Sequence, residues 1–179
     1  MAGQKILLGC TFATIFALAL ASPITISNST TTNKFQYIGN TEGKIFLKAE
    51  LIPAEQYGVT WLRAVQICSD GGYQMASITS QKQDDIVAAF VTGTGPDSRN
   101  WMWIDGSNFA AGGNLTVWSS LHTGQPLTFF NWVRGRPVSP ATAGARQCLR
   151  WSSNSMEAGW WDIDCTDKHN VLCETQVSN

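Results

Sequence analysis

Cysteines constrain this 179-residue chain more than any other feature of its sequence. The chain contains five of them, and a disulfide between two distant cysteines fixes which segments of a fold must lie together. Disulfides persist in exported proteins and are rare in the cytosol. What these residues can do therefore depends on whether the chain leaves the cell.

The first 21 residues are predicted to be an export signal peptide. A short basic start ends at Lys5, the apolar run 6–20 follows, and Ala19-Leu20-Ala21 has the small-x-small pattern of a cleavage site. The run is short for a membrane span and lacks basic flanks, although an uncleaved anchor is the alternative. No later stretch of about 18 apolar residues occurs in the sequence. We therefore expect a secreted, extracellular protein with no membrane span.

Cleavage removes Lys5 and Cys10, which leaves four cysteines and a formal net charge of −2. An even number of cysteines in an exported chain indicates disulfides, and four cysteines allow three pairings. Zinc is not expected, because the sequence has no CxxC or HxxxH spacing and its two histidines, at 122 and 169, lie far apart. The charge, with no cluster of Lys or Arg, argues against nucleic acid as a partner.

The remaining chain has room for one folded domain. Its content of hydrophobic residues, 44%, is too high for a disordered chain. The polar stretch 22–34 is expected to be a flexible leader and 176–179 a C-terminal tail, so that the domain spans 35–175. Two sequons, at Asn28 and Asn114, are predicted glycosylation sites in an exported protein.

Hydrophobic spacing predicts two helices in the first half of the domain. The first covers 60–69 with Thr60 as N-cap, and two glycines follow it. Its buried face is expected to hold Trp61, Ala64, Val65 and Cys68. The second begins at Ser80, which forms a capping box with Gln83, and it ends at Gly93. Its buried stripe is expected to hold Ile86, Ala89 and Phe90.

The segments with strand-like patterns are short. They are 44–49, 101–104, 117–118, 127–132, 148–151 and 170–174. Residues 134–146, which contain two Pro and two Gly, are expected to form a loop. Two helices followed by short antiparallel strands and a long loop region predict an α+β fold.

An ordered set of motifs runs through residues 35–174. They are Trp61-Leu62-Arg63-Ala64, Met75-Ala76-Ser77-Ile78, Trp103-Ile104-Asp105-Gly106, Gly124-Gln125-Pro126-Leu127-Thr128, Asn131-Trp132, Trp161-Asp162 and Val171-Leu172-Cys173-Glu174. With the cysteines, this set resembles a C-type lectin-like domain, closest to the secreted single-domain C-type lectins of arthropods. The resemblance covers nearly the whole mature chain. It implies the C-type lectin-like fold and two disulfides, Cys68 with Cys173 and Cys148 with Cys165.

Members of this family that bind sugar hold a Ca²⁺ ion with oxygen ligands from three places. The resemblance maps these places onto Arg136-Pro137-Val138 in the long loop, Arg146 before Cys148, and Trp161-Asp162 before Cys165. Only Asp162 keeps an acidic side chain, and two guanidinium groups would repel a divalent cation. Acids supplied from elsewhere are scarce, because the loop 133–147 contains none. We therefore expect no Ca²⁺ at this site, and no other metal or cofactor.

These positions remain candidates for binding a ligand. They are Arg136, Pro137, Val138, Arg146, Trp161 and Asp162. With Arg134 and Arg150, they would form a surface of cations and aromatic rings suited to acidic glycans, sulfate or a protein partner. The structural alternative is that Trp161 packs under the loop and the arginines are solvated.

No catalytic residue is expected. His122 and His169 have no partnered nucleophile, the sequence has no GxSxG elbow, and the two histidines are interpreted as a turn and a surface residue. Asp84-Asp85 open a helix, where the helix dipole accounts for them. Asp162 and Asp164 are expected to be structural rather than a glycosidase pair.

The sequence thus predicts a secreted, non-catalytic recognition module. Its expected ligand is carbohydrate, either a glycan or a microbial surface polysaccharide, bound without the usual Ca²⁺ site. The resemblance suggests a role in innate immunity. The alternative is a module that has lost sugar binding and binds an extracellular protein, and a structural component of an extracellular coat is a third interpretation.

Overall fold

The computed structural model describes residues 33–93, 101–108, 116–138, 147–153 and 157–177. By its internal contacts the chain divides into residues 1–30 and residues 31–179, and every described residue belongs to the second unit. The first unit therefore lies outside the described residues, as do Arg146 and both predicted glycosylation sites, Asn28 and Asn114. Signal peptide, leader, domain boundaries and glycosylation stay predictions.

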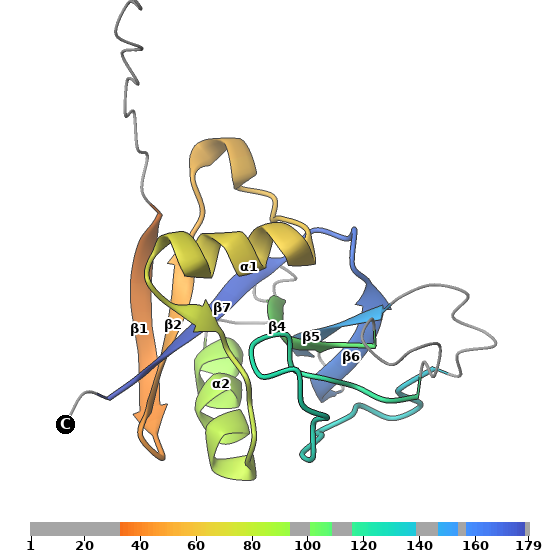
Figure 1. The fold of residues 1–179 in the computed structure, drawn as a ribbon. Coiled ribbons are helices and arrows are strands. Elements are labelled where there is room, and N and C mark those ends of the chain that lie inside the picture. Colours follow the sequence, from red (N-terminus) through yellow and green to blue (C-terminus); the bar gives the residue numbers. More distant parts are fainter. Residues whose placement is uncertain (1–32, 94–100, 109–115, 139–146, 154–156, 178–179) are drawn as a thin grey trace, which may run out of the picture. The chain divides into compact units, whose positions relative to one another are not determined.

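The described elements are two α-helices, a short 3-10 helix and a seven-stranded sheet (Figure 1). The helices are η1 (Pro53–Glu55), α1 (Trp61–Asp70) and α2 (Gln81–Gly93). The strands are β1 (Lys34–Thr41), β2 (Lys44–Glu50), β3 (Gln74–Met75), β4 (Met102–Ser107), β5 (Gln147–Ser153), β6 (Ala158–Asp164) and β7 (Asn170–Gln176). The predicted α+β class is confirmed.

The sheet has the order β1-β2-β7-β4-β5-β6, with β3 pairing with β7. All pairings are antiparallel except that of β4 with β7, which is parallel and makes the sheet mixed. The last strand of the chain therefore lies inside the sheet between early elements. This placement closes the domain, because β7 pairs with β2, β3 and β4.

Helix α1 begins as the sequence predicts. The Thr60 side chain accepts a hydrogen bond from Arg63 N at 3.5 Å, which is an N-cap contact. The buried face holds Trp61, Ala64, Ile67 and Cys68. Ile67 replaces the predicted Val65, which is only half-buried, because the helix turns its Cys68 side toward β7.

Helix α2 is capped as predicted, but it buries a different face from the predicted one. The Ser80 hydroxyl accepts from Gln83 N at 3.3 Å, and Gln83 Oε1 accepts from Thr79 N at 2.8 Å. The buried side chains are Gln83, Asp84, Val87 and Val91. The predicted stripe of Ile86, Ala89 and Phe90 was wrong, since Ala89 is exposed and the other two are only partly buried. The rotation follows from Asp84, whose carboxylate is hydrogen-bonded in the core.

The strand predictions were confirmed for β2, β4, β5 and β7, within a few residues at each end. The segments 117–118 and 127–132 were wrong as strands, because the described residues there make only isolated bridges such as Trp132 with Trp160. Strands β1, β3 and β6 were not predicted. Neither β1 nor β6 has the run of aliphatic residues on which strand prediction depends.

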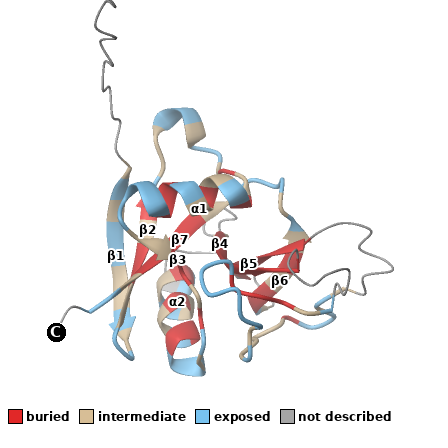
Figure 2. Ribbon diagram, in the orientation of Figure 1, coloured by how far each residue is buried: buried red, intermediate tan, exposed pale blue. Residues whose placement is uncertain are grey.

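Two hydrophobic clusters lie on the two faces of the sheet, since side chains alternate along each strand. In β4, Met102 and Ile104 belong to the cluster that includes Val87 of α2, whereas Trp103 belongs to the cluster that includes Trp61 of α1. Figure 2 shows buried residues along the strands of the sheet other than β1 and in patches on both helices.

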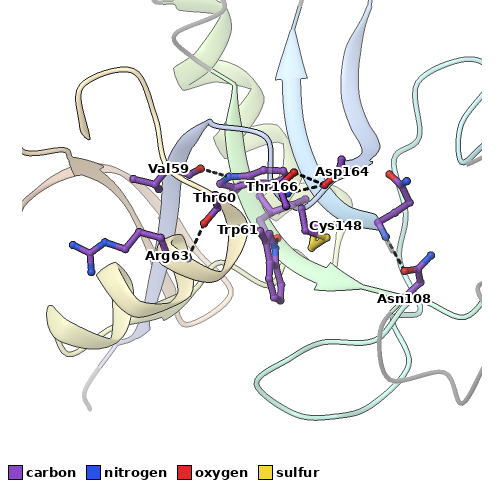
Figure 3. The surroundings of a disulfide bond; sticks show 12 residues. Val59, Thr60, Trp61, Arg63, Asn108, Cys148, Asp164 and Thr166 are labelled. Atoms are coloured by element: carbon purple, nitrogen blue, oxygen red, sulfur yellow. Dashed lines mark hydrogen bonds between the residues drawn. A yellow bond between two sulfur atoms is a disulfide. The ribbon is translucent and has the colours of Figure 1, made fainter. Parts of the chain in front are cut away.

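The two disulfides are those that the resemblance implies. Cys68 in α1 pairs with Cys173 in β7, and Cys148 in β5 pairs with Cys165 just after β6. Figure 3 shows the second bond among Trp61, Asp164 and Thr166, near the start of α1. Trp61 N donates to the Cys165 carbonyl oxygen at 3.0 Å, so this disulfide also anchors the beginning of α1.

Candidate functional site

The loop 131–138 lies along β6 and brings the predicted site residues together. Trp160 N donates to the Asn131 carbonyl oxygen at 2.7 Å, and Val133 N donates to the Trp160 carbonyl oxygen at 3.2 Å. Gly159 permits this approach, because its φ is 150° and a Cβ there would lie 2.6 Å from the Asn131 carbonyl oxygen. The peptide bond between Arg136 and the following proline is cis.

Asp162 is the centre of the site. It is 1% exposed and pairs with Leu149 in the β5–β6 register. Arg136 Nη1 donates to Asp162 Oδ1 at 3.0 Å and to the Asp162 carbonyl oxygen at 2.9 Å. Val138 N donates to Asp162 Oδ2 at 2.8 Å. Both carboxylate oxygens therefore have a donor, and one of the donors carries a full positive charge.

These residues do not fit a calcium ion. Ca²⁺ takes six to eight oxygen ligands, several of them carboxylates. Here the one acidic side chain of the set, Asp162, is already bonded to Arg136 and Val138. In the part of the chain that the structure describes, no group of three or more His, Cys, Asp or Glu side chains is placed to hold a metal ion.

Four side chains, Arg136, Trp161, Arg150 and Trp101, stack alternately and are termed here the cation–aromatic ladder. The Arg136 guanidinium carbon lies 4.4 Å from the Trp161 ring centre. The Arg150 guanidinium carbon lies 5.4 Å from the Trp161 ring centre and 4.0 Å from that of Trp101. Cation–π attraction strengthens where water is excluded, and Arg150 is 4% exposed. The ladder links the loop to β6, to β5 and to the residue before β4.

The buried cation Arg150 is held by a neutral histidine. Its Nη1 lies 3.2 Å from His169 Nε2, and because arginine only donates, Nε2 accepts and the ring proton resides on Nδ1. The His169 ring contacts Trp101 and Trp103 edge-on, with ring centres 5.9 and 4.7 Å apart. Burial, and then the charge of Arg150, lower the pKa of His169 to about 3. Burial, and then the charge of Arg136, lower the pKa of Arg150 to about 10.

Five of the six predicted ligand-binding residues lie in one place, and Arg146 lies outside the described residues. The five are Arg136, Pro137, Val138, Trp161 and Asp162. The structural alternative is wrong for Arg150, which is buried rather than solvated, although Arg134 is exposed. The prediction of His169 as a surface residue was also wrong, since it is half-buried.

Trp101, Trp103 and His169 were missed at this site because they lie far from the loop in sequence. For Arg150, which the sequence analysis did include, the strand pattern also indicates the direction of the side chain. Side chains alternate along a strand, so Arg150 points away from its neighbours Leu149 and Trp151 and toward the opposite face of the sheet.

The helix-opening acid Asp84 is not explained by the helix dipole alone. It is 1% exposed and accepts hydrogen bonds from Trp160 Nε1 at 2.7 Å, Trp151 Nε1 at 2.9 Å and Asn131 Nδ2 at 2.6 Å. Burial raises the pKa of Asp84 despite these donors. The carboxylate therefore joins α2 to β5, β6 and the start of the site loop.

The other candidate acids and histidine have structural surroundings. Asp85 is exposed and accepts from Gln81 Nε2 at 2.8 Å. Asp164 accepts from the Thr166 amide and hydroxyl, both at 2.8 Å, which lowers the pKa of Asp164. His122 is exposed in a turn, as predicted.

In the described residues, no helix has the length and apolar character needed to cross a membrane. Comparison with known proteins agrees with the fold. Residues 57–175 match the family model of the lectin C-type domain.

The relatives that the chain resembles include two mosquito C-type lectins. It is 28% identical over 121 residues to salivary C-type lectin 2 of Aedes albopictus, covering 64% of this chain and 76% of that protein. It is 26% identical over 126 residues to C-type lectin mosGCTL-7 of Culex quinquefasciatus, covering 68% of this chain and 71% of that protein. The solved structure of the Ca²⁺-independent C-type lectin SPL-2 from Saxidomus purpuratus superposes with a TM-score of 0.60 at 18% identity, over 83% of this chain and 94% of that one. The chain belongs to the C-type lectin domain family.

Proposed function

We propose that this protein is an exported, non-catalytic recognition module that binds carbohydrate without a Ca²⁺ ion. The observation that carries the proposal is the ion pair between Arg136 and Asp162. A Ca²⁺ site needs Asp162 as a free ligand, whereas here the arginine supplies the positive charge and the loop amide of Val138 takes the second oxygen. The loop is thus attached to β6 by a side chain instead of a metal.

The family supports carbohydrate as the ligand class, and the neighbour SPL-2 bears the description Ca²⁺-independent. The mosquito relative described as salivary agrees with export, as does the predicted signal peptide. The ligand surface would be formed by Arg136, Trp161 and the exposed Arg134. Guanidinium groups bind carboxylate and sulfate groups, so acidic glycans fit best.

A panel of glycans and microbial polysaccharides, probed with millimolar Ca²⁺ and again with a chelator, tests the proposal. We expect the same ligands in both arms, and Trp161→Ala should weaken their binding at least tenfold. Tyr37→Ala is the matched control, because Tyr37 is an exposed aromatic residue of β1, 57% exposed, outside the ladder. Binding that disappears with chelator would overturn the metal-free mode. No glycan binding, either with Ca²⁺ or with chelator, would favour the alternative, a module that binds an extracellular protein.

Calorimetry addresses the ion directly. We expect no heat of Ca²⁺ binding at micromolar to millimolar concentration, because Asp162 is already paired. Micromolar binding that Asp162→Ala abolishes would show instead that Ca²⁺ displaces Arg136 from the carboxylate.

A further inference from the structure

A pocket of about 290 Å³ lies between α1, β3 and the segment 116–125, away from the residues of the long-loop site. Its walls include Val65, Tyr73, Met75, Leu121 and His122, and Asp105 of β4 also lines it. Ser69 and Gln74 also line it, so the apolar and aromatic side chains share the pocket with a small number of polar groups. This combination resembles ordinary small-ligand sites, in which an apolar pocket carries few polar groups.

The carboxylate of Asp105 is only half satisfied. The residue is 2% exposed, and Oδ1 accepts from Leu121 N at 2.9 Å. Oδ2 is buried and has no hydrogen-bond partner among the described residues. Burial raises the pKa of Asp105, although the Ser120 hydroxyl and the Leu121 amide oppose the shift. Buried carboxylate oxygens are normally bonded, so an unpaired one marks a place where a donor is missing.

No cation of the described part of the chain pairs with Asp105. The charge of Lys44 reaches this carboxylate, but its Nζ is bonded to Glu174 at 3.0 Å and to the Ser77 carbonyl oxygen. His122, the other charge-bearing group that faces Asp105, is exposed. The missing donor is therefore one that a ligand could supply.

We propose that this pocket binds a small organic cation, with its ammonium group toward Asp105 and its apolar part against Val65, Met75 and Leu121. The ammonium supplies donors and a positive charge to the unpaired oxygen. The Tyr73 ring adds an aromatic wall, which also favours a cation. Anions are repelled by the carboxylate, and a metal ion finds no group of three acidic, His or Cys ligands in the described residues. The proposal is independent of glycan binding at the long loop.

The test is a titration of the full, oxidised chain with phenethylammonium and, separately, with phenethyl alcohol, followed by calorimetry and by amide NMR shifts. The two probes share size and apolar body and differ in charge. We expect a Kd on the order of 0.1–1 mM for the ammonium, in keeping with a ligand of this size, and at least tenfold weaker binding of the alcohol. Equal affinity for both probes, or no binding of either, would overturn the proposal.

Two variants and a control locate the site. Asp105→Asn keeps an oxygen for the Leu121 amide and removes the charge, so it should weaken ammonium binding at least tenfold. Leu121→Lys tests the pocket in a second way. This residue is 52% exposed, and the new side chain would offer its own ammonium to the pocket and so should weaken binding of the ligand. Asp164→Asn removes an exposed carboxylate elsewhere and should leave the Kd unchanged. Undiminished binding by Asp105→Asn or by Leu121→Lys would place the ligand outside this pocket.

Discussion

At the scale of single residues, the site depends on two buried charges, of which one is paired with an opposite charge and the other is not. Asp162 is nearly inaccessible and takes its donors from Arg136 and Val138. Arg150 is also buried, but no carboxylate of the described residues lies within 4.0 Å of it, and its partners are His169 and two indole rings. A buried charge that loses its partner keeps the cost of its desolvation, so single substitutions here should be large.

Removal of the Arg136 side chain should destabilise the fold. Arg136→Ala leaves the Asp162 carboxylate with a backbone donor and no opposite charge, which should lower the free energy of unfolding by about 3 kcal/mol. Denaturant unfolding measures it. Arg134→Ala is the matched control, because that side chain is exposed and should change stability by less than about 0.5 kcal/mol. Equal effects of the two substitutions would contradict the importance of the ion pair.

His169 should make stability depend on pH. Its pKa is about 3 in the folded protein and 6.5 as a free side chain, so the unfolded chain binds a proton more tightly. Stability from this group is therefore complete above pH 6.5 and is lost as the pH falls toward the folded pKa. Between pH 7.5 and 5.0 the full shift corresponds to about 2 kcal/mol, which solvent screening at this half-buried ring reduces to about 1 kcal/mol.

His169→Gln separates this contribution from other acid effects. Glutamine keeps an acceptor for Arg150 but does not titrate. Urea unfolding at both pH values should show about 1 kcal/mol less loss of stability for the variant than for the parent chain. An identical loss in both proteins would show that another group is responsible.

At the scale of elements, α2 is attached to the sheet by one carboxylate. Asp84 accepts from two indoles, those of Trp151 in β5 and Trp160 in β6, and from Asn131 at the start of the site loop. The same side chain therefore sets the rotation of the helix and the position of the loop that carries Arg136. A hydrophobic pattern alone does not predict this, because it counts Asp84 as polar and places it outward.

Substitution of Asp84 should be costly although it is a surface-type residue at a helix start. Asp84→Ala leaves three donors without their acceptor, two of them buried indole N–H groups, and should lower the free energy of unfolding by about 3–5 kcal/mol. Asp85→Ala, the neighbouring exposed acid, should cost less than about 0.5 kcal/mol. Thermal unfolding of both variants, with the indole N–H resonances as a local probe, distinguishes a core role from a helix-dipole role.

At the scale of the whole molecule, the two disulfides close loops of very different length. Cys68–Cys173 joins residues 105 apart and links the first helix to the central strand, whereas Cys148–Cys165 joins residues 17 apart within one part of the sheet. A longer loop restricts the unfolded chain more.

Removing each cysteine pair in turn should show which disulfide contributes more to the free energy of unfolding. In the chain-entropy model, loss of the 105-residue loop costs about 4.7 kcal/mol and loss of the 17-residue loop about 3.1 kcal/mol. Unfolding of Cys68→Ala/Cys173→Ala and of Cys148→Ala/Cys165→Ala compares them, and we expect the first variant to be the less stable. The opposite order would mean that contacts around Cys165, where Trp61 is anchored, outweigh chain entropy.

Sequence reasoning succeeded where the signal is local or carried by an ordered motif set. The caps at Thr60 and Ser80 depend on residues three apart, and both were confirmed. The disulfide pairing followed from the family resemblance, since spacing alone left three pairings open. The buried stripe of α2 and the strands at 117–118 and 127–132 were wrong, because hydrophobicity was their only support and tertiary hydrogen bonds decided otherwise.

The sequence by itself therefore indicated the family and, through the family resemblance, the two disulfides and the expected replacement of calcium ligands by arginine and tryptophan. Only the tertiary structure decided what these replacements do. Arg136 and Asp162 are 26 residues apart, and Asp84 lies 67 and 76 residues from its two indole donors. Whether such distant groups meet depends on how the sheet, α2 and the loop pack together. A carboxylate is read from the sequence as a potential metal ligand, and only its burial beside a guanidinium shows that its charge is already balanced.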